Sequence, residues 1–163
     1  GFAVNSMSSH TARLMLYAFS AVMGLSLSSI FLVFKLGSIA QVFFISAATF
    51  GTASLYGYTT KKDLTAAGSF VYMGLIGLII ASLINIFLRS AALDFAVSFI
   101  GVGIFTILTA YDTQKLKSIY YSMNGTTARA GSIAVYGALT LYLDFINLFT
   151  MLLHFFGVRK DND

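Results

Sequence analysis

The chain contains no cysteine and no proline among its 163 residues. The lack of cysteine excludes disulfides, a thiolate nucleophile and Cys-based metal or iron–sulfur sites. The lack of proline means that any kink in a helix must come from Gly or Ser. Glutamate is missing as well, so the six acidic residues are all aspartates.

Charge is also scarce, because only 10% of the residues are charged while 58% are hydrophobic. Globular domains carry about a quarter charged residues, so this balance indicates a lipid environment. Ten Lys and Arg against six Asp give a net charge of +4. These basic residues stand singly or in pairs between apolar runs, which argues against nucleic-acid binding.

Long apolar runs separated by short charged breaks make up most of the chain. They are Leu14 to Phe34, Leu36 to Thr60, Leu64 to Leu88, Phe95 to Tyr111, and a stretch from about Ile133 to Val158 that contains Asp144 and His154. A membrane-spanning helix needs about 20 apolar residues. A soluble all-α core would instead need helices with a polar face, which the first four runs lack.

We therefore expect an all-α fold, a polytopic membrane helix bundle that forms one domain over residues 1–163. The expected spans are about 14–34, 38–60, 64–88, 95–112 and 133–157. Small residues four apart, such as Ala47 with Gly51 and Gly77 with Ala81, have the spacing that lets membrane helices approach closely.

The basic residues near the ends of the runs predict an orientation in the membrane. One side receives Arg13, Lys61, Lys62, Lys115, Lys117 and Arg129, and the other receives Lys35, Arg89, Arg159 and Lys160. By the positive-inside rule, the first side is expected to be cytoplasmic, with the C-terminus outside.

Two aspartates within the apolar runs are the strongest functional signal, because ionisable groups are costly inside a membrane. Asp112 ends the fourth run and Asp144 lies inside the fifth. At ~1.5 Å rise per residue, Asp112 is about 26 Å from Phe95, and Asp144 is about 20 Å from Gly157. Both distances start from the same membrane face, so the two carboxylates lie at similar depth on consecutive helices and can meet.

Two carboxylates in contact in a low-dielectric setting cannot both stay ionised, so such a pair would share a proton and titrate in two coupled steps. The alternative for Asp112 is a solvated helix end beside Lys115 and Lys117. Neither helix capping nor a neighbouring lysine explains Asp144. His10 and His154 lie far apart without ligand-spaced partners, so we predict no metal site from them and no cofactor.

Three motifs resemble one family of membrane proteins. They are Ala110-Tyr111-Asp112-Thr113-Gln114-Lys115, the stretch Leu141-Tyr142-Leu143-Asp144-Phe145-Ile146-Asn147-Leu148-Phe149, and Lys61-Lys62-Asp63-Leu64 upstream. Together they resemble the Bax inhibitor-1 family, also called transmembrane Bax inhibitor motif proteins, in its bacterial branch. The resemblance covers nearly the whole chain.

The resemblance implies a seven-helix membrane bundle in which the five spans here correspond to the third to seventh helices. The chain begins at Gly1 without Met, with Gly1 to Val4 read as the tail of an earlier helix, so we expect an N-terminally incomplete member. The family also places an arginine near the aspartate pair. The corresponding position falls near Ser6, where this chain has no basic residue.

The resemblance further implies a pH-sensitive calcium leak of the inner membrane, with Asp112 and Asp144 as the proton sensor. We expect no enzymatic activity, and we expect lipid and calcium or another cation as partners. Deprotonation would leave negative charge that attracts a hard, oxygen-preferring cation. Nearby neutral oxygens that could assist are those of Thr109, Thr113, Gln114 and Asn147.

Two other functions compete with the leak. One is a non-conducting regulator that binds a membrane protease or another membrane protein. The other is an intramembrane aspartyl protease, which Tyr111-Asp112 resembles. That resemblance fails at Asp144, which no glycine precedes in Leu141-Tyr142-Leu143, and in the lack of proline for the Pro-Ala-Leu element of those enzymes.

Overall fold

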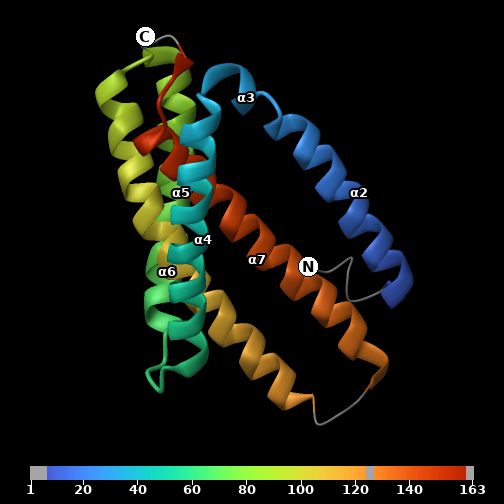
Figure 1. Cartoon of the computed structure of the whole chain (residues 1–163). Coiled ribbons are helices and arrows are strands. Elements are labelled where there is room, and N and C mark those ends of the chain that lie inside the picture. Colours follow the sequence, from blue (N-terminus) through green and yellow to red (C-terminus); the bar gives the residue numbers. More distant parts are fainter. Residues whose placement is uncertain (1–6, 124–126, 161–163) are drawn as a thin grey trace.

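The computed structural model describes residues 7–123 and 127–160, and within them the protein is a bundle of helices without a β-sheet (Figure 1). The helices are α2 (Ser9–Leu27), α3 (Ile30–Val33), α4 (Leu36–Thr59), α5 (Thr65–Leu88), α6 (Ala91–Ser122) and α7 (Thr127–Phe156). Five segments in this part of the chain are long and apolar enough to cross a membrane. The predicted all-α membrane bundle with five spans is therefore confirmed. The expected helix tail at residues 1–4 lies outside the described residues.

The first span is not one continuous helix. It begins at Ser9, where the Ser8 side chain accepts a hydrogen bond from the Thr11 amide, and it breaks between α2 and α3. At the break, the Ser28 and Ser29 hydroxyls donate to backbone carbonyls one turn earlier. Serine hydroxyls that bond to the preceding turn are a known cause of helix bending, as expected in a proline-free chain.

Helix α6 is longer than the predicted span, which was expected to end near residue 112. The helix continues for ten more residues to Ser122. Hydropathy marks where a helix leaves the hydrocarbon, and residues such as Gln114, Lys115 and Leu116 are good helix formers that do not end it. Leu116 also packs beside Gly137 of α7, so tertiary contacts support the extension.

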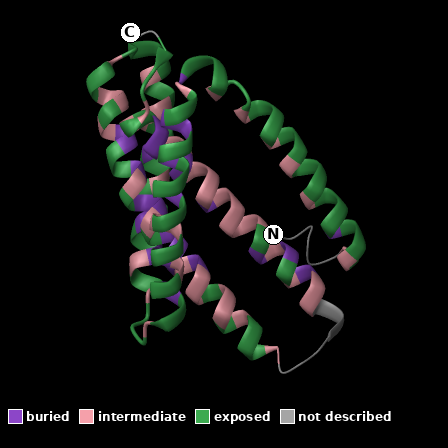
Figure 2. Ribbon diagram, in the orientation of Figure 1, coloured by how far each residue is buried: buried purple, intermediate pink, exposed green. Residues whose placement is uncertain are grey.

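The core of the bundle lies around α6, which packs on α4, α5 and α7. In Figure 2 the buried residues gather where these four helices meet, whereas α2 is exposed along most of its length. The largest fully buried side chains include Leu108 on α6 and Leu148 and Leu153 on α7. Helix α2 packs mainly against α7. The site described below lies on the α6 side of α7.

Two glycines allow the close approach of helices around α6. A Cβ at Gly57 of α4 would overlap the backbone of Ala110, and one at Gly68 of α5 would overlap the Tyr111 ring. The spacing of small residues pointed to other positions. Gly51 and Gly77 have nothing within 4 Å of an added Cβ, so the expectation of close packing is wrong at these two glycines. Both Gly51 and Gly77 are exposed on the outside of the bundle.

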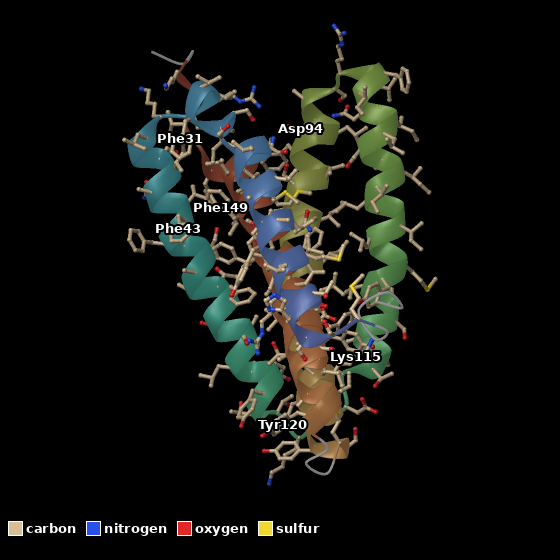
Figure 3. All side chains as sticks on the ribbon, turned by 90° about the vertical axis from the view of Figure 1, so that its right-hand side faces the viewer. Phe31, Phe43, Asp94, Lys115, Tyr120 and Phe149 are labelled. Carbon is tan, nitrogen blue, oxygen red and sulfur yellow. The ribbon has the colours of Figure 1, made fainter. Side chains whose placement is uncertain are left out.

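The two ends of the bundle carry the two groups of basic residues defined from the sequence. At one end, Phe34 pairs with Arg159 in an isolated β-bridge, and the Lys35 amide donates to the Val158 carbonyl at 2.9 Å. Figure 3 shows Lys115 and Tyr120 toward the opposite end from Asp94 and Phe31. The grouping of the basic residues by side therefore agrees with the fold.

Candidate functional site

Asp112 and Asp144 lie next to each other in the interior of the bundle. Asp112 comes from α6 and is 3% exposed, and Asp144 comes from α7 and is 6% exposed. Their carboxyl groups lie close enough to interact directly. The structure thus brings together the two residues that the depth comparison placed at the same level. It also removes the alternative of a solvated helix end for Asp112.

A tyrosine from a third helix completes the contacts of the pair. The Tyr72 hydroxyl of α5 donates to Oδ1 of Asp112 at 3.4 Å. The Tyr72 ring lies edge-on to Tyr111, with 5.9 Å between ring centroids, and Tyr111 is in turn seated against Gly68. Sequence reasoning missed Tyr72. No sequence pattern separates this tyrosine from the other hydroxyl-bearing residues of the same run, such as Ser69 and Ser82.

The pair has no basic partner in the described part of the chain. Neither carboxylate forms an ion pair with a Lys or Arg side chain of residues 7–123 and 130–160, and Oδ2 of Asp144 is buried without a hydrogen-bond partner among them. Ser6, the position where the family's arginine was expected to be replaced, lies outside the described residues. Two negative charges placed this close in the interior would repel each other without a compensating cation among the described side chains.

Two of the predicted supporting residues, Thr109 and Thr113, lie on α6 near Asp112. Their hydroxyls form hydrogen bonds with groups other than the two carboxyls. The Thr109 hydroxyl is fully buried and donates to the Phe105 carbonyl at 2.7 Å. The Thr113 hydroxyl donates to the Thr109 carbonyl at 2.7 Å and lies 3.1 Å from the Ser54 hydroxyl of α4. These contacts join α4 to α6 beside the pair, and they direct the hydroxyls away from the two carboxylates.

The other two predicted residues point elsewhere. Gln114 binds the connection between α4 and α5: its Oε1 accepts from the Leu64 amide at 2.9 Å, and its Nε2 donates to the Lys62 carbonyl at 2.7 Å. Asn147 donates to the Leu143 carbonyl at 2.9 Å and lines a pocket of about 350 Å³ beside Leu78 and Met151. The structure therefore brings together the aspartates but not the four neutral residues.

The described residues contain no cluster of three or more His, Cys, Asp or Glu side chains that could hold a metal ion. Calcium takes 6–8 oxygen ligands in proteins. Asp112, Asp144 and the Tyr72 hydroxyl supply too few oxygens for a storage site.

Comparison with known proteins gives consistent matches along the chain. Residues 1–161 match the family described as "Inhibitor of apoptosis-promoting Bax1". An uncharacterized protein of Caulobacter vibrioides is 49% identical over 161 residues, which cover 99% of this chain and 64% of that protein. A protein of Rickettsia prowazekii is 50% identical, with 95% of this chain and 65% of that protein covered.

A further relative is the inner membrane protein YbhL of Escherichia coli, which is 49% identical over 96% of this chain and 68% of its own length. The chain thus spans about two thirds of the length of these relatives. The match to an inner membrane protein and the five spanning helices agree with the localisation expected from the sequence. The family match along nearly the whole chain and these identities show that the chain belongs to the Bax inhibitor-1 family.

Proposed function

We propose that this protein is a pH-dependent cation leak of the bacterial inner membrane in which Asp112 and Asp144 act as the proton-controlled element. The observation that carries the proposal is the contact between two buried carboxylates with no basic partner in the described chain. The protonation of such a pair depends on pH, because no neighbouring cation among the described side chains offsets its negative charge. Calcium is the favoured ion, since it is a hard cation that prefers oxygen ligands.

The two protonation states of the pair differ in what they offer a cation. With one shared proton, the carboxyls are joined by a hydrogen bond and carry a single negative charge. After loss of that proton, two negative charges face each other. Their repulsion is reduced by a nearby cation or by separation of α6 and α7. A change of pH therefore alters both the local charge and the packing of these two helices. We expect the change between about pH 5 and 8.

The neighbouring groups favour the aspartate pair as the source of the pH response. Among the described residues, the Tyr72 hydroxyl of α5 contacts the pair, and Tyr111 of α6 packs on the Tyr72 ring. Lys115 and Lys117 lie beyond Asp112 on α6, and Lys61 and Lys62 lie in the connection between α4 and α5. Other aspartates, such as Asp63 and Asp94, lie at the ends of helices, where water reaches them.

The test is calcium flux into liposomes that contain the purified protein, measured at pH 5 and pH 8. The wild-type protein should pass calcium at rates that differ between the two pH values. Asp112→Asn and Asp144→Asn should each shift or flatten this dependence, because each removes one of the two interacting acids. The double variant should lose this dependence, because no titratable carboxyl of the pair remains.

Asp94→Asn is the matched control, because it makes the same chemical change at the opposite end of α6. It should keep the wild-type pH profile. If both single variants of the pair also keep that profile, the proposal is wrong. A protein that passes no ion at either pH would instead be a regulator of a membrane protease or another membrane protein. Cleavage of a transmembrane substrate helix would favour the aspartyl protease.

A further inference from the structure

A second site lies on the other side of α6, where α4 and α5 leave a groove between them. Both helices pack on α6 but scarcely on each other. The groove has a volume of about 810 Å³, with Ile107 and Ala110 of α6 as its floor. Ala53 and Tyr56 line it from α4, and Ala67 lines it from α5. Its lining is almost entirely apolar, and small side chains keep it open.

A basic hollow of about 670 Å³ continues this groove toward the end of the bundle. Its lining includes Lys61, Lys62 and Asp63 of the connection between α4 and α5, together with Gln114 and Lys117 of α6. Ile107, Ala110, Gln114 and Lys117 follow one another at intervals of three or four residues, which is one face of a helix. The apolar groove and the basic hollow are therefore consecutive along the same face of α6.

The charge of the hollow is positive, because three lysines and one aspartate line it. The Asp63 carboxylate is engaged by the amide and the hydroxyl of Thr65. Lys117 is held in place: its ammonium donates to the Tyr58 carbonyl at 2.7 Å and lies 4.7 Å from the centre of the Tyr58 ring. Lys61 and Lys62 are exposed. The hollow thus presents positive charge to an anion at the level of the membrane surface.

The distances match one leaflet of a bilayer. Ile107 and Lys117 are ten residues apart on α6, which corresponds to about 15 Å along the helix. Half of the ~30 Å hydrocarbon core has the same thickness. A molecule with an acyl chain along the groove would therefore place its head group beside the lysines. Basic pockets between transmembrane helices are typical sites for anionic lipid head groups.

We propose that this face of α6 binds an anionic phospholipid, with an acyl chain in the groove between α4 and α5 and the phosphate beside Lys61, Lys62 and Lys117. The apolar groove favours a lipid over free phosphate, because inorganic phosphate gains nothing from apolar walls. Gln114 keeps the lysines in position, since it bonds the backbone of the connection to α6 at Lys62 and Leu64. This site is separate from the aspartate pair and does not depend on its function.

The test measures retention of phosphatidylglycerol and phosphatidylcholine by the purified full chain, using native mass spectrometry in detergent. The wild-type protein should retain phosphatidylglycerol in preference. Combined Lys61→Gln, Lys62→Gln and Lys117→Gln should lower this preference by about tenfold or more. Ala67→Phe fills the groove, so it should lower the retention of both lipids.

Two variants are matched controls. Lys115→Gln removes an exposed lysine of α6 outside the hollow, and Ala66→Phe adds the same ring at an exposed position outside the groove. Both should behave as wild type, and circular dichroism verifies that every variant remains helical. The proposal is overturned if Lys115→Gln lowers the preference as much as the triple change does. It also fails if inorganic phosphate alone stabilises the protein to heat as well as phosphatidylglycerol does, with and without Ala67→Phe.

Discussion

Two polar residues only two positions apart on α6 have opposite surroundings. Asp112 faces α7 and α5 and is buried against Asp144 and Tyr72. Gln114 faces the connection between α4 and α5 and satisfies both ends of its amide there. One face of α6 thus holds a buried carboxyl beside a second carboxyl, while the other holds an amide that is hydrogen-bonded at both its oxygen and its nitrogen. The side of the helix, more than the residue's place in the sequence, decides which partners a polar group meets.

The largest effect on stability is expected at Gly57, where α4 approaches α6 most closely beside Ala110. Gly57→Ala would place a Cβ against the Ala110 backbone, which cannot move without displacing α6. Overpacking of this kind costs about 1–3 kcal/mol. Thermal unfolding in detergent should therefore occur at a lower temperature. Gly51→Ala, on the same helix with open space around it, should be neutral or stabilising, because alanine favours helix. Equal effects of the two changes would contradict the packing described.

A smaller effect is expected from removing the amide that holds the connection. Gln114→Ala loses two hydrogen bonds, to the Leu64 amide and the Lys62 carbonyl. We expect a loss of about 1–2 kcal/mol in the free energy of unfolding and faster proteolysis within residues 60–64. Gln41→Ala, an exposed glutamine of α4, is the control and should change neither. Unaltered proteolysis of the Gln114 variant would show that the connection is held by other contacts.

The smallest effect is expected at Asp63, the exposed aspartate of the connection. Hydrogen bonds from the Thr65 hydroxyl and then the Thr65 amide hold the pKa of Asp63 below its usual value. Because the folded-state pKa is the lower one, this contribution is present above about pH 4 and is lost as the pH falls further. Asp63→Asn should therefore leave the pH profile of thermal stability unchanged from pH 5 to 8. A change in that window would assign part of the pH response to this end of the bundle.

Much of the membrane architecture could be predicted from the sequence, because spans depend on the length and hydropathy of single segments. Even the meeting of Asp112 and Asp144 followed from the rise of a helix and the thickness of a membrane. What could not be predicted depends on rotation about the helix axis. Gly57 and Gly68 carry the close contacts instead of Gly51 and Gly77, since the facing side chains decide which glycine is needed.

Tyr72 and Gln114 illustrate the same limit in the candidate site. A single tyrosine in an apolar run has no sequence pattern that assigns it to Asp112, 40 residues away. Gln114 is adjacent to the aspartate motif, and this proximity suggested a shared role, yet its side chain leaves α6 on another face. The ten additional residues of α6 were missed for a different reason, because polarity ends a span without ending a helix.

We propose above that Asp112 and Asp144 share one proton and release it within the range of pH 5 to 8. Infrared difference spectroscopy of the protein in lipid measures this directly, since a protonated carboxyl has a carbonyl band that a carboxylate lacks. We expect one such band to disappear between pH 5 and pH 8, and its pH dependence to change in Asp112→Asn and Asp144→Asn but not in Asp94→Asn. If no carboxyl band is lost in this range, or if both variants of the pair leave the loss unchanged, the two aspartates do not share a proton that is released there.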